Sequence, residues 1–206
     1  MDRFDGAIAG VGTRSGVRLV VGMWSASPFG TVTDVMVERS DGHRILIAPT
    51  RTVADYIAAT YTFDEVRVET VALDRIAPSR LDVRAESLNL SITVGRRTGL
   101  GRVLGLVPRR MARTVAWCRV TDPAARLVRH GVRTVGSAGG GRREYYCALD
   151  EHQVIAASAR LDNRDLGPLA PLAPPVRFGF SSAPARPSLV DVTTLIADGP
   201  QGPENV

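Results

Sequence analysis

The stretch TVTDVMVERSDGHRILI, residues 31–47, indicates most clearly how this chain folds. From Thr31 to Glu38 the residues alternate, with Val32, Asp34, Met36 and Glu38 on one side and Thr33, Val35 and Val37 on the other. A period of two residues is typical of a β-strand with two different faces. Asp41-Gly42 is a strong turn signal, and a second β run, His43 to Ile47, follows it. This stretch therefore predicts an antiparallel β-hairpin.

Short β runs separated by turn residues continue on both sides of this hairpin. The predicted strands are Val17 to Met23, Glu65 to Leu73, Leu81 to Val94, Thr114 to Val120, Val132 to Val135, Glu144 to Leu149, Gln153 to Leu161, Val176 to Ser181 and Leu189 to Ile196. Many short strands along the whole length are typical of an antiparallel β-barrel or sandwich. We expect a mainly β (α+β) fold with two or three short helices. Residues 1–197 are expected to form one domain, followed by a disordered polar tail at 198–206.

Three segments predict the helices. Thr52 to Tyr61 has apolar residues at helical spacing, with Thr52 as the expected N-cap. Leu100 to Val107 repeats that spacing before Pro108 ends it. Asp122-Pro123 is expected to be an N-cap and first-turn proline, which start a helix that ends at Gly131.

Positive charge is concentrated in the middle of the chain, in a segment that we call the arginine belt, Gly95 to Arg143. Its 49 residues hold twelve arginines and one acid, Asp122, so its net charge is +11, whereas the remainder is −6. Such a field favours an anionic partner, such as a phosphate, a carboxylate, a nucleic acid or a lipid headgroup. The same arginines are also explained by pairing with acids elsewhere, such as Asp64, Glu65, Glu69, Asp82 and Glu86.

All 26 basic residues are arginine, and this limits the chemistry of the chain. Without lysine, Schiff-base catalysis, phosphate-loop lysines and lysine general bases are excluded. Arginine stays protonated and offers a planar fork of donors, which suits it to binding anions rather than moving protons.

Histidine and cysteine give no motif for a catalytic or metal site. His43, His130 and His152 lack metal-ligand spacing relative to one another. Cys118 and Cys147 are expected to be buried thiols in strands, although adjacent strands would bring them within bridging distance. We therefore assign no catalytic residue, metal or cofactor. The chain also has no secretory or membrane-spanning segment, and we expect a cytoplasmic protein with reduced thiols.

The candidate site residues are arginines of the belt and aromatic side chains. Arg109, Arg110 and Arg113 crowd the start of the run at Thr114, and Arg142-Arg143 follow the loop Gly136 to Gly141. We expect these arginines to bind the charged end of a ligand, because guanidinium matches carboxylate and phosphate in bidentate geometry. The expected apolar contacts are Trp24, Trp117, Tyr145 and Phe178. From sequence alone, the interior of a barrel is either packed core or ligand cavity.

Two local resemblances accompany these patterns. Ser27-Pro-Phe-Gly-Thr-Val-Thr-Asp34 resembles the Ser-Pro-x-Gly strand start of acetoacetate-decarboxylase-like β-barrels. The resemblance implies a large antiparallel barrel around a small-molecule cavity, but the family's lysine imine has no counterpart in this lysine-free chain. The run from Val132 to Glu144 and the run Pro175 to Ser182 are similar to uncharacterised proteins of high-GC bacteria, a likeness that implies no activity.

Three functions are compatible with the sequence. The first hypothesis is a non-enzymatic protein that binds a small anionic or amphipathic molecule through arginines and an aromatic-lined cavity. The second is contact of the arginine belt with nucleic acid or an anionic membrane surface. The third is an enzyme with a His/Cys site. The sequence also leaves open whether the chain forms a homo-oligomer.

Overall fold

The computed structural model describes residues 1–128, 134–137, 139–179 and 183–197, with the backbone alone at 123–128, 137 and 140. The predicted tail at 198–206 and the predicted helix end at Gly131 lie outside the described residues. Along the chain the strands are β1 (Asp2–Thr13), β2 (Arg18–Ala26), β3 (Val32–Glu38), β4 (Arg44–Ala48), β5 (Glu65–Val68), β6 (Ala72–Ala77), β7 (Arg80–Arg84), β8 (Leu88–Arg97), β9 (Val135–Ser137), β10 (Arg143–Leu161), β11 (Arg164–Asp165), β12 (Leu169–Ala170) and β13 (Ser188–Ala197). The helices are α1 (Arg51–Ala58), α2 (Gly99–Leu104), α3 (Arg109–Ala112), α4 (Val115–Val128) and the 3-10 turn η1 (Gly139–Gly141).

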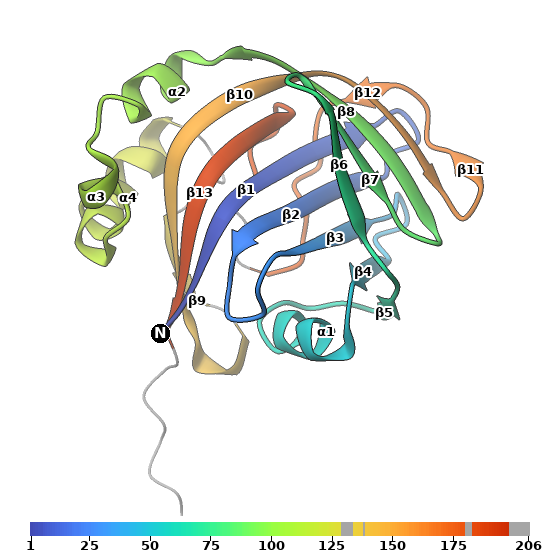
Figure 1. The fold of residues 1–206 in the computed structure, drawn as a ribbon, viewed down its shortest axis with the longest axis horizontal. Helices are drawn as coiled ribbons and strands as arrows, with labels where there is room; N and C mark the ends of the chain where they lie inside the picture. Colours follow the sequence, from blue (N-terminus) through green and yellow to red (C-terminus); the bar gives the residue numbers. More distant parts are fainter. Residues whose placement is uncertain (129–133, 138, 180–182, 198–206) are drawn as a thin grey trace, which may run out of the picture.

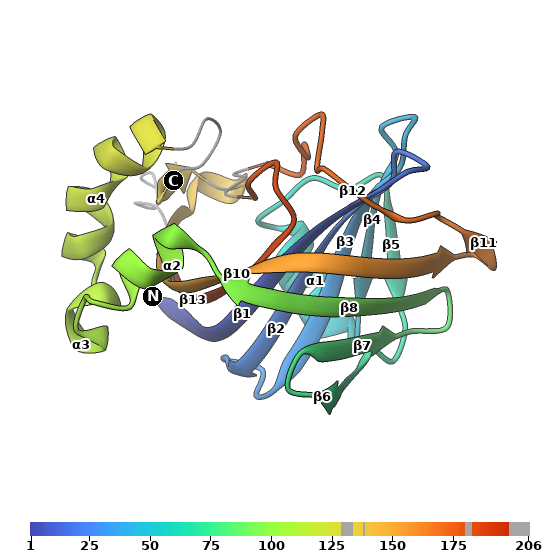
Figure 2. The ribbon, with the colours of Figure 1, turned by 90° about the horizontal axis from the view of Figure 1, so that it is seen from above.

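The strands form one 13-stranded sheet in the order β5-β4-β3-β2-β1-β13-β10-β8-β7-β6, with β9, β11 and β12 paired to its sides. All pairs are antiparallel except β4 with β5, which are parallel across α1. The sheet curls into a half-barrel, so that β6 and β7 come round to face β2 and β3 (Figures 1 and 2). The mainly β class predicted from the sequence is confirmed, and the described residues contain four short α-helices.

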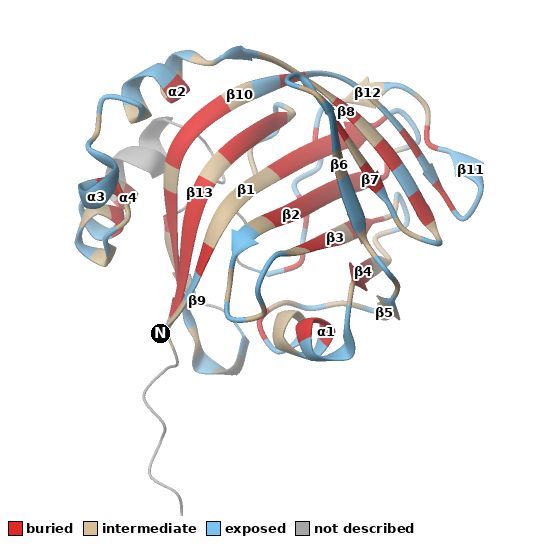
Figure 3. Ribbon diagram, viewed as in Figure 1, coloured by how far each residue is buried: buried red, intermediate tan, exposed pale blue. Residues whose placement is uncertain are grey.

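The hairpin predicted from residues 31–47 is confirmed as β3 and β4, in antiparallel register from Val35↔Ile47 to Glu38↔Arg44. Gly42 supplies the turn with a φ of +89°, a conformation that favours glycine. On β2–β4, alternate residues therefore face opposite sides of the sheet. Figure 3 shows that these strands are buried along most of their length.

Hydrophobic cores lie on both faces of the sheet. On the concave face, Leu19, Val21 and Val35 pack with residues of β7 and β8 that come from the opposite wall of the half-barrel, including Leu81, Val83 and Ile92. On the convex face, Leu46 and Ala48 of β4 pack against Val53 and Ala54 of α1. β7 and β8 face β2–β4 because the sheet curls, and they form no strand pairs with β2–β4. The interior is therefore core over much of its length.

Several predicted boundaries are wrong, and tertiary contacts explain them. Asp2–Thr13 was not predicted as a strand because glycines interrupt its pattern. At Gly6 the strand bulges against β2, and a Cβ there would lie 2.0 Å from the carbonyl oxygen of Met23. The runs 65–73 and 81–94 each divide into two strands, whereas 144–149 and 153–161 join as β10. No strand forms at 176–179, and 180–181 lie outside the described residues.

The predicted strand Thr114 to Val120 is also wrong, because this segment opens helix α4. The Thr114 hydroxyl accepts a hydrogen bond from the Trp117 backbone N–H at 3.2 Å, which caps the helix. Asp122 is therefore not an N-cap. It lies within α4 and accepts hydrogen bonds from the backbone N–H groups of Thr134 and Val135. On α1 the N-cap is Thr50, not the predicted Thr52.

Candidate functional site

A large hollow, which we call the concave cavity, lies inside the half-barrel next to the core. Its volume is about 780 Å³, within the range typical of small-molecule sites. Ala7, Met23, Leu81 and Leu189 belong both to its wall and to the core of the concave face. One part of the half-barrel interior is thus filled by the hydrophobic core, and another part is an open cavity.

The cavity wall carries charges of both signs beside apolar and aromatic side chains. The charged residues are Asp5, Arg75, Arg109, Arg113 and Asp191. The aromatic residues are Trp24 and Phe29, which belong to an aromatic cluster with Phe4 and Tyr56. This composition fits a ligand that has both a charged group and an apolar part.

Helix α3 brings two belt arginines to this wall. Arg109 begins the helix and Arg113 follows its last residue, so they lie four positions apart and on one side of it. Ala112, between them, is 2% exposed and holds the segment against the rest of the protein. Packing of α3 against β10 fixes its position.

Helix α2, which precedes α3, is fixed to β10 at close range. The Thr98 hydroxyl donates to Oε2 of buried Glu151 at 2.5 Å, and the Thr98 backbone N–H donates to the Glu151 carbonyl at 2.9 Å. A Cβ at Gly101 would lie 2.3 Å from the same carbonyl oxygen, so only glycine permits this approach. The helical segment therefore starts from a defined point on the long strand.

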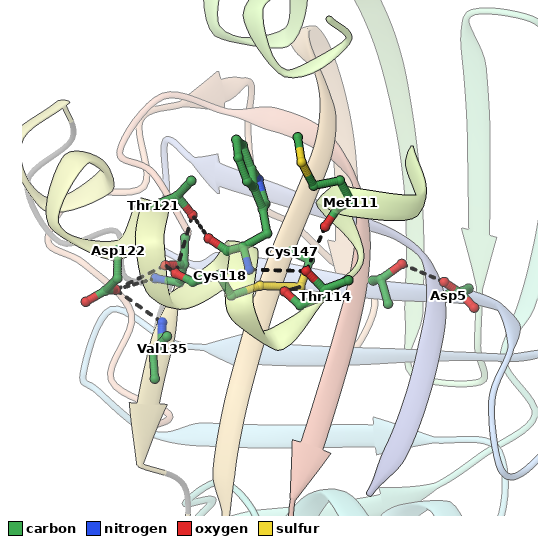
Figure 4. The surroundings of a disulfide bond; sticks show 11 residues. Asp5, Met111, Thr114, Cys118, Thr121, Asp122, Val135 and Cys147 are labelled. Carbon is green, nitrogen blue, oxygen red and sulfur yellow. Dashed lines mark hydrogen bonds between the residues drawn. A yellow bond between two sulfur atoms is a disulfide. The ribbon is translucent and has the colours of Figure 1, made fainter. Parts of the chain in front are cut away.

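On the C-terminal side of α3, a disulfide between Cys118 of α4 and Cys147 of β10 links the helices to the sheet (Figure 4). The expectation of reduced thiols in two strands is wrong for this structure, because Cys118 is helical and neither cysteine is free. The two cysteines do lie within bridging distance, but a helix and a strand bring them together, not two adjacent strands. Cys118, Cys147, Tyr145 and Leu195 form one small buried cluster. Attachments on both sides thus hold α3 beside the cavity.

The two belt arginines of the cavity wall, Arg109 and Arg113, lack strong partners among the described residues. Arg109 makes no side-chain hydrogen bond or ion pair with any described residue. The Nε atom of Arg113 lies 4.0 Å from Asp5 Oδ1, and this buried Nε has no hydrogen-bond partner in the described part of the chain. The Arg113 side chain as a whole is 33% exposed, so part of this cationic group remains accessible from the cavity.

The other sequence candidates lie outside the concave cavity. Arg110 is exposed on α3, and Arg143 is exposed at the start of β10. Arg142 stacks over the Tyr56 ring at 4.7 Å. Of the aromatic candidates, Trp24 lines the cavity, whereas Trp117 does not. Tyr145 packs beneath α4 and Phe178 belongs to a core on the convex face.

Three of the five acids suggested as partners of the belt bind other arginines, and Glu69 accepts hydrogen bonds from Ser87. Asp64 pairs with Arg44, Glu65 with Arg67 and Asp82 with Arg80. Among the belt arginines, Arg97 pairs with Asp150, and Arg113 makes a long contact with Asp5. The described arginines of the belt therefore point in several directions, and of these Arg109 and Arg113 line the concave cavity.

Sequence reasoning missed a second hollow, which we call the back cavity, of about 60 Å³ between α1 and the convex face. Its wall contains two buried carboxyl groups, Asp34 and Glu144, and the Thr194 hydroxyl, which lacks a hydrogen-bond partner among the described residues. Burial raises the pKa of each carboxyl group to about 7. In the sequence, Asp34 shares one side of its strand with Val32 and Met36, and this position among apolar residues could have indicated a buried carboxyl group.

Each buried carboxyl group has one neutral hydrogen-bond donor. The Trp24 indole N–H donates to Asp34 Oδ1 at 3.0 Å, and the Tyr61 hydroxyl donates to Glu144 Oε2 at 2.7 Å. Trp24 lines both cavities, so its indole connects Asp34 with the wall of the concave cavity. These hydrogen bonds lower the pKa, but burial outweighs them.

Histidines do not contribute to the concave cavity in the described structure. His43 lies 3.1 Å from Glu65 at the β4–β5 side of the sheet, His152 is half-buried on β10, and His130 lies outside the described residues. The described residues contain no group of three or more His, Cys, Asp or Glu side chains arranged to hold a metal ion. Among the helices of the described chain, none has the length and apolar character needed to span a bilayer.

Comparison with known proteins adds no assignment. No protein-family model matches the chain, and no curated protein or solved structure is significantly similar to it. The resemblance of Ser27–Asp34 to acetoacetate-decarboxylase-like β-barrels therefore stays a prediction.

Proposed function

We propose that the chain is a non-enzymatic binding protein whose concave cavity takes a small anionic or amphipathic molecule. The observation that carries this proposal is Arg109, a guanidinium at the wall of a cavity of about 780 Å³ without a partner among the described residues. A carboxylate or phosphate would receive charge-assisted hydrogen bonds from the guanidinium groups of Arg109 and Arg113. Trp24 and Phe29 would contact the apolar part of the ligand.

The test measures binding through the fluorescence of Trp24. The chain has two tryptophans, so Trp117→Phe leaves Trp24 as the only indole reporter. Octanoate is titrated into this variant, with 1-octanol as the uncharged probe and octyltrimethylammonium as the cationic probe. We expect octanoate to bind most tightly, since only the carboxylate matches the arginines.

Arginine variants then locate the anion. Arg109→Ala and Arg113→Ala should each weaken octanoate binding by about 10- to 100-fold, the range for a hydrogen bond to a charged group. Arg110→Ala is the matched control, because Arg110 lies on the same short helix but outside the cavity wall. Equal effects of Arg109→Ala and Arg110→Ala would overturn the assignment.

Contact of α2–α4 with an anionic membrane surface is the second candidate function. Leu106, Val120 and Val103 are 83%, 73% and 61% exposed in this arginine-rich segment. Exposed apolar side chains among cationic ones are typical of interfacial binding. Binding to phosphatidylserine-containing vesicles that weakens with salt would support it, and equal binding to neutral phosphatidylcholine vesicles would contradict it.

A further inference from the structure

The wall of the concave cavity has a carboxylate without a described partner, Asp191, as well as the guanidinium of Arg109. Asp191 is half-buried in its wall and makes no hydrogen bond or ion pair with a described residue. On β13 it lies between Leu189 and Thr193 on the inward-facing side, in register with Ala7 of β1 and Asp150 of β10. The fold thus places in the cavity wall a carboxylate that no described residue neutralises.

Arg97, the arginine whose pKa the charge of Asp191 affects, already forms an ion pair with Asp150. Arg97 Nε donates to both oxygens of Asp150 at 2.7 and 2.9 Å. These hydrogen bonds raise the pKa of Arg97, and the charge of Asp191 adds a smaller through-space contribution. Because the Arg97 guanidinium binds Asp150, it leaves Asp191 without an ion pair.

Asp5, the other carboxylate of the wall, differs in this respect. Arg3 donates to it through two nitrogens at 2.7 and 3.1 Å, and the Thr193 hydroxyl donates to Oδ1 at 2.6 Å. Burial opposes ionisation of Asp5, but these hydrogen bonds outweigh it and lower the pKa. Asp5 is therefore a satisfied structural carboxylate, whereas Asp191 is available to a ligand.

We infer that the ligand of the concave cavity is an aminocarboxylate, whose anionic group meets Arg109 and Arg113 and whose ammonium group meets Asp191. This inference rests on the proposed function, and it narrows the ligand class from an anion to a zwitterion. A purely anionic ligand would bring a second negative charge into the same cavity as Asp191, and like charges repel. An ammonium group instead offers three donors to a carboxylate that has none.

The test uses three probes with the same five-carbon chain: 5-aminopentanoate, glutarate and 1,5-diaminopentane. Their dissociation constants are measured by titration calorimetry on the full chain. We expect 5-aminopentanoate to bind at least tenfold more tightly than the other two. Asp191→Asn should reduce this preference by at least tenfold through weaker 5-aminopentanoate binding, with glutarate binding unchanged or stronger. Asp165→Asn, an exposed carboxylate outside the cavity, is the matched control.

The outcomes separate the two proposals. If glutarate or octanoate binds in an Arg109-dependent manner but Asp191→Asn leaves 5-aminopentanoate binding unchanged, the zwitterion inference fails and the proposed function stands. If neither carboxylate probe binds at 10 mM, both fail. Thermal melting of Asp191→Asn confirms that the variant is folded, and the glutarate titration supplies an independent readout of the same cavity.

Discussion

Asp34 should make the stability of this protein fall as the pH rises towards neutrality. Burial raises the pKa of Asp34 from its ordinary value of 3.8 to about 7, against a smaller opposite effect of the Trp24 hydrogen bond. The folded protein therefore holds this proton more tightly than the unfolded chain does. The resulting stabilisation is fully present below pH 3.8 and is lost as the pH rises through about 7.

The magnitude follows from the two pKa values. At about 1.36 kcal/mol per pH unit, the interval from 3.8 to about 7 corresponds to about 4 kcal/mol of unfolding free energy. Asp34→Asn removes the ionisation but keeps an oxygen that accepts the Trp24 N–H. The variant should therefore resemble the wild type at pH 4 and should gain about 4 kcal/mol relative to it by pH 8.

Urea unfolding, followed by tryptophan fluorescence at several pH values, gives the difference between the two proteins. Taking this difference cancels the titration of all other groups that the substitution leaves undisturbed. Asp55→Asn is the control, because the Asp55 side chain is 62% exposed, and its difference from wild type should vary little with pH. A constant difference between Asp34→Asn and wild type from pH 4 to pH 8 would refute the reasoning.

Two further predictions concern the attachments of helices to the sheet. Replacement of both Cys118 and Cys147 by alanine should lower the unfolding free energy by about 3–4 kcal/mol, because the disulfide closes a loop with a sequence separation of 29. Thiol titration of the denatured wild type without reductant should detect no free thiol. Two free thiols would contradict the pairing. Thr50→Ala should cost about 1 kcal/mol in chemical denaturation because its hydroxyl caps α1, whereas Thr52→Ala should cost less. Equal losses for the two threonine variants would show that the cap contributes nothing measurable.

Local pattern was sufficient where neighbouring residues decide the structure. The alternation of residues 31–38 and the Asp41-Gly42 turn predicted the β3–β4 hairpin, because strand period and turn type depend on the residues themselves. The helix at 52–61 was found by the spacing of its apolar residues, although its cap was assigned two positions late. Such errors at element boundaries arise because Thr50 and Thr52 are equally good caps in isolation.

Local pattern failed where distant contacts decide the structure. Thr114 to Val120 is rich in residues that favour strands, yet it is helical. Its cap at Thr114 and the packing of Val115 and Cys118 against Tyr145 stabilise the helix. β1 was missed because glycines interrupt its alternation. Pairing with β2 and with β13, which lies far away in the sequence, forms this strand.

The candidate site also depends partly on local sequence pattern and partly on contacts between distant residues. Arg109, Arg113 and Trp24 were selected from the sequence and meet at the concave cavity, but Arg110, Arg142 and Arg143 were selected on the same grounds and lie outside it. The net charge of +11 over 49 residues gives only the balance of arginines and acids in this segment. It says nothing about the side chains' directions, which depend on the helices and strands that carry them.

The sequence by itself determined the mainly β class, the β3–β4 hairpin and the restriction to arginine, because these depend on residue type and short spacing. The tertiary structure alone decided that part of the half-barrel interior is open, that Arg109 and Arg113 of the arginine belt reach it, and that Asp191 and Asp34 are placed in cavity walls. The physical reason is the curl of the sheet. It brings residues more than a hundred positions apart, such as Asp5 and Arg113, to within 4.0 Å, and no pattern of neighbouring residues specifies that meeting.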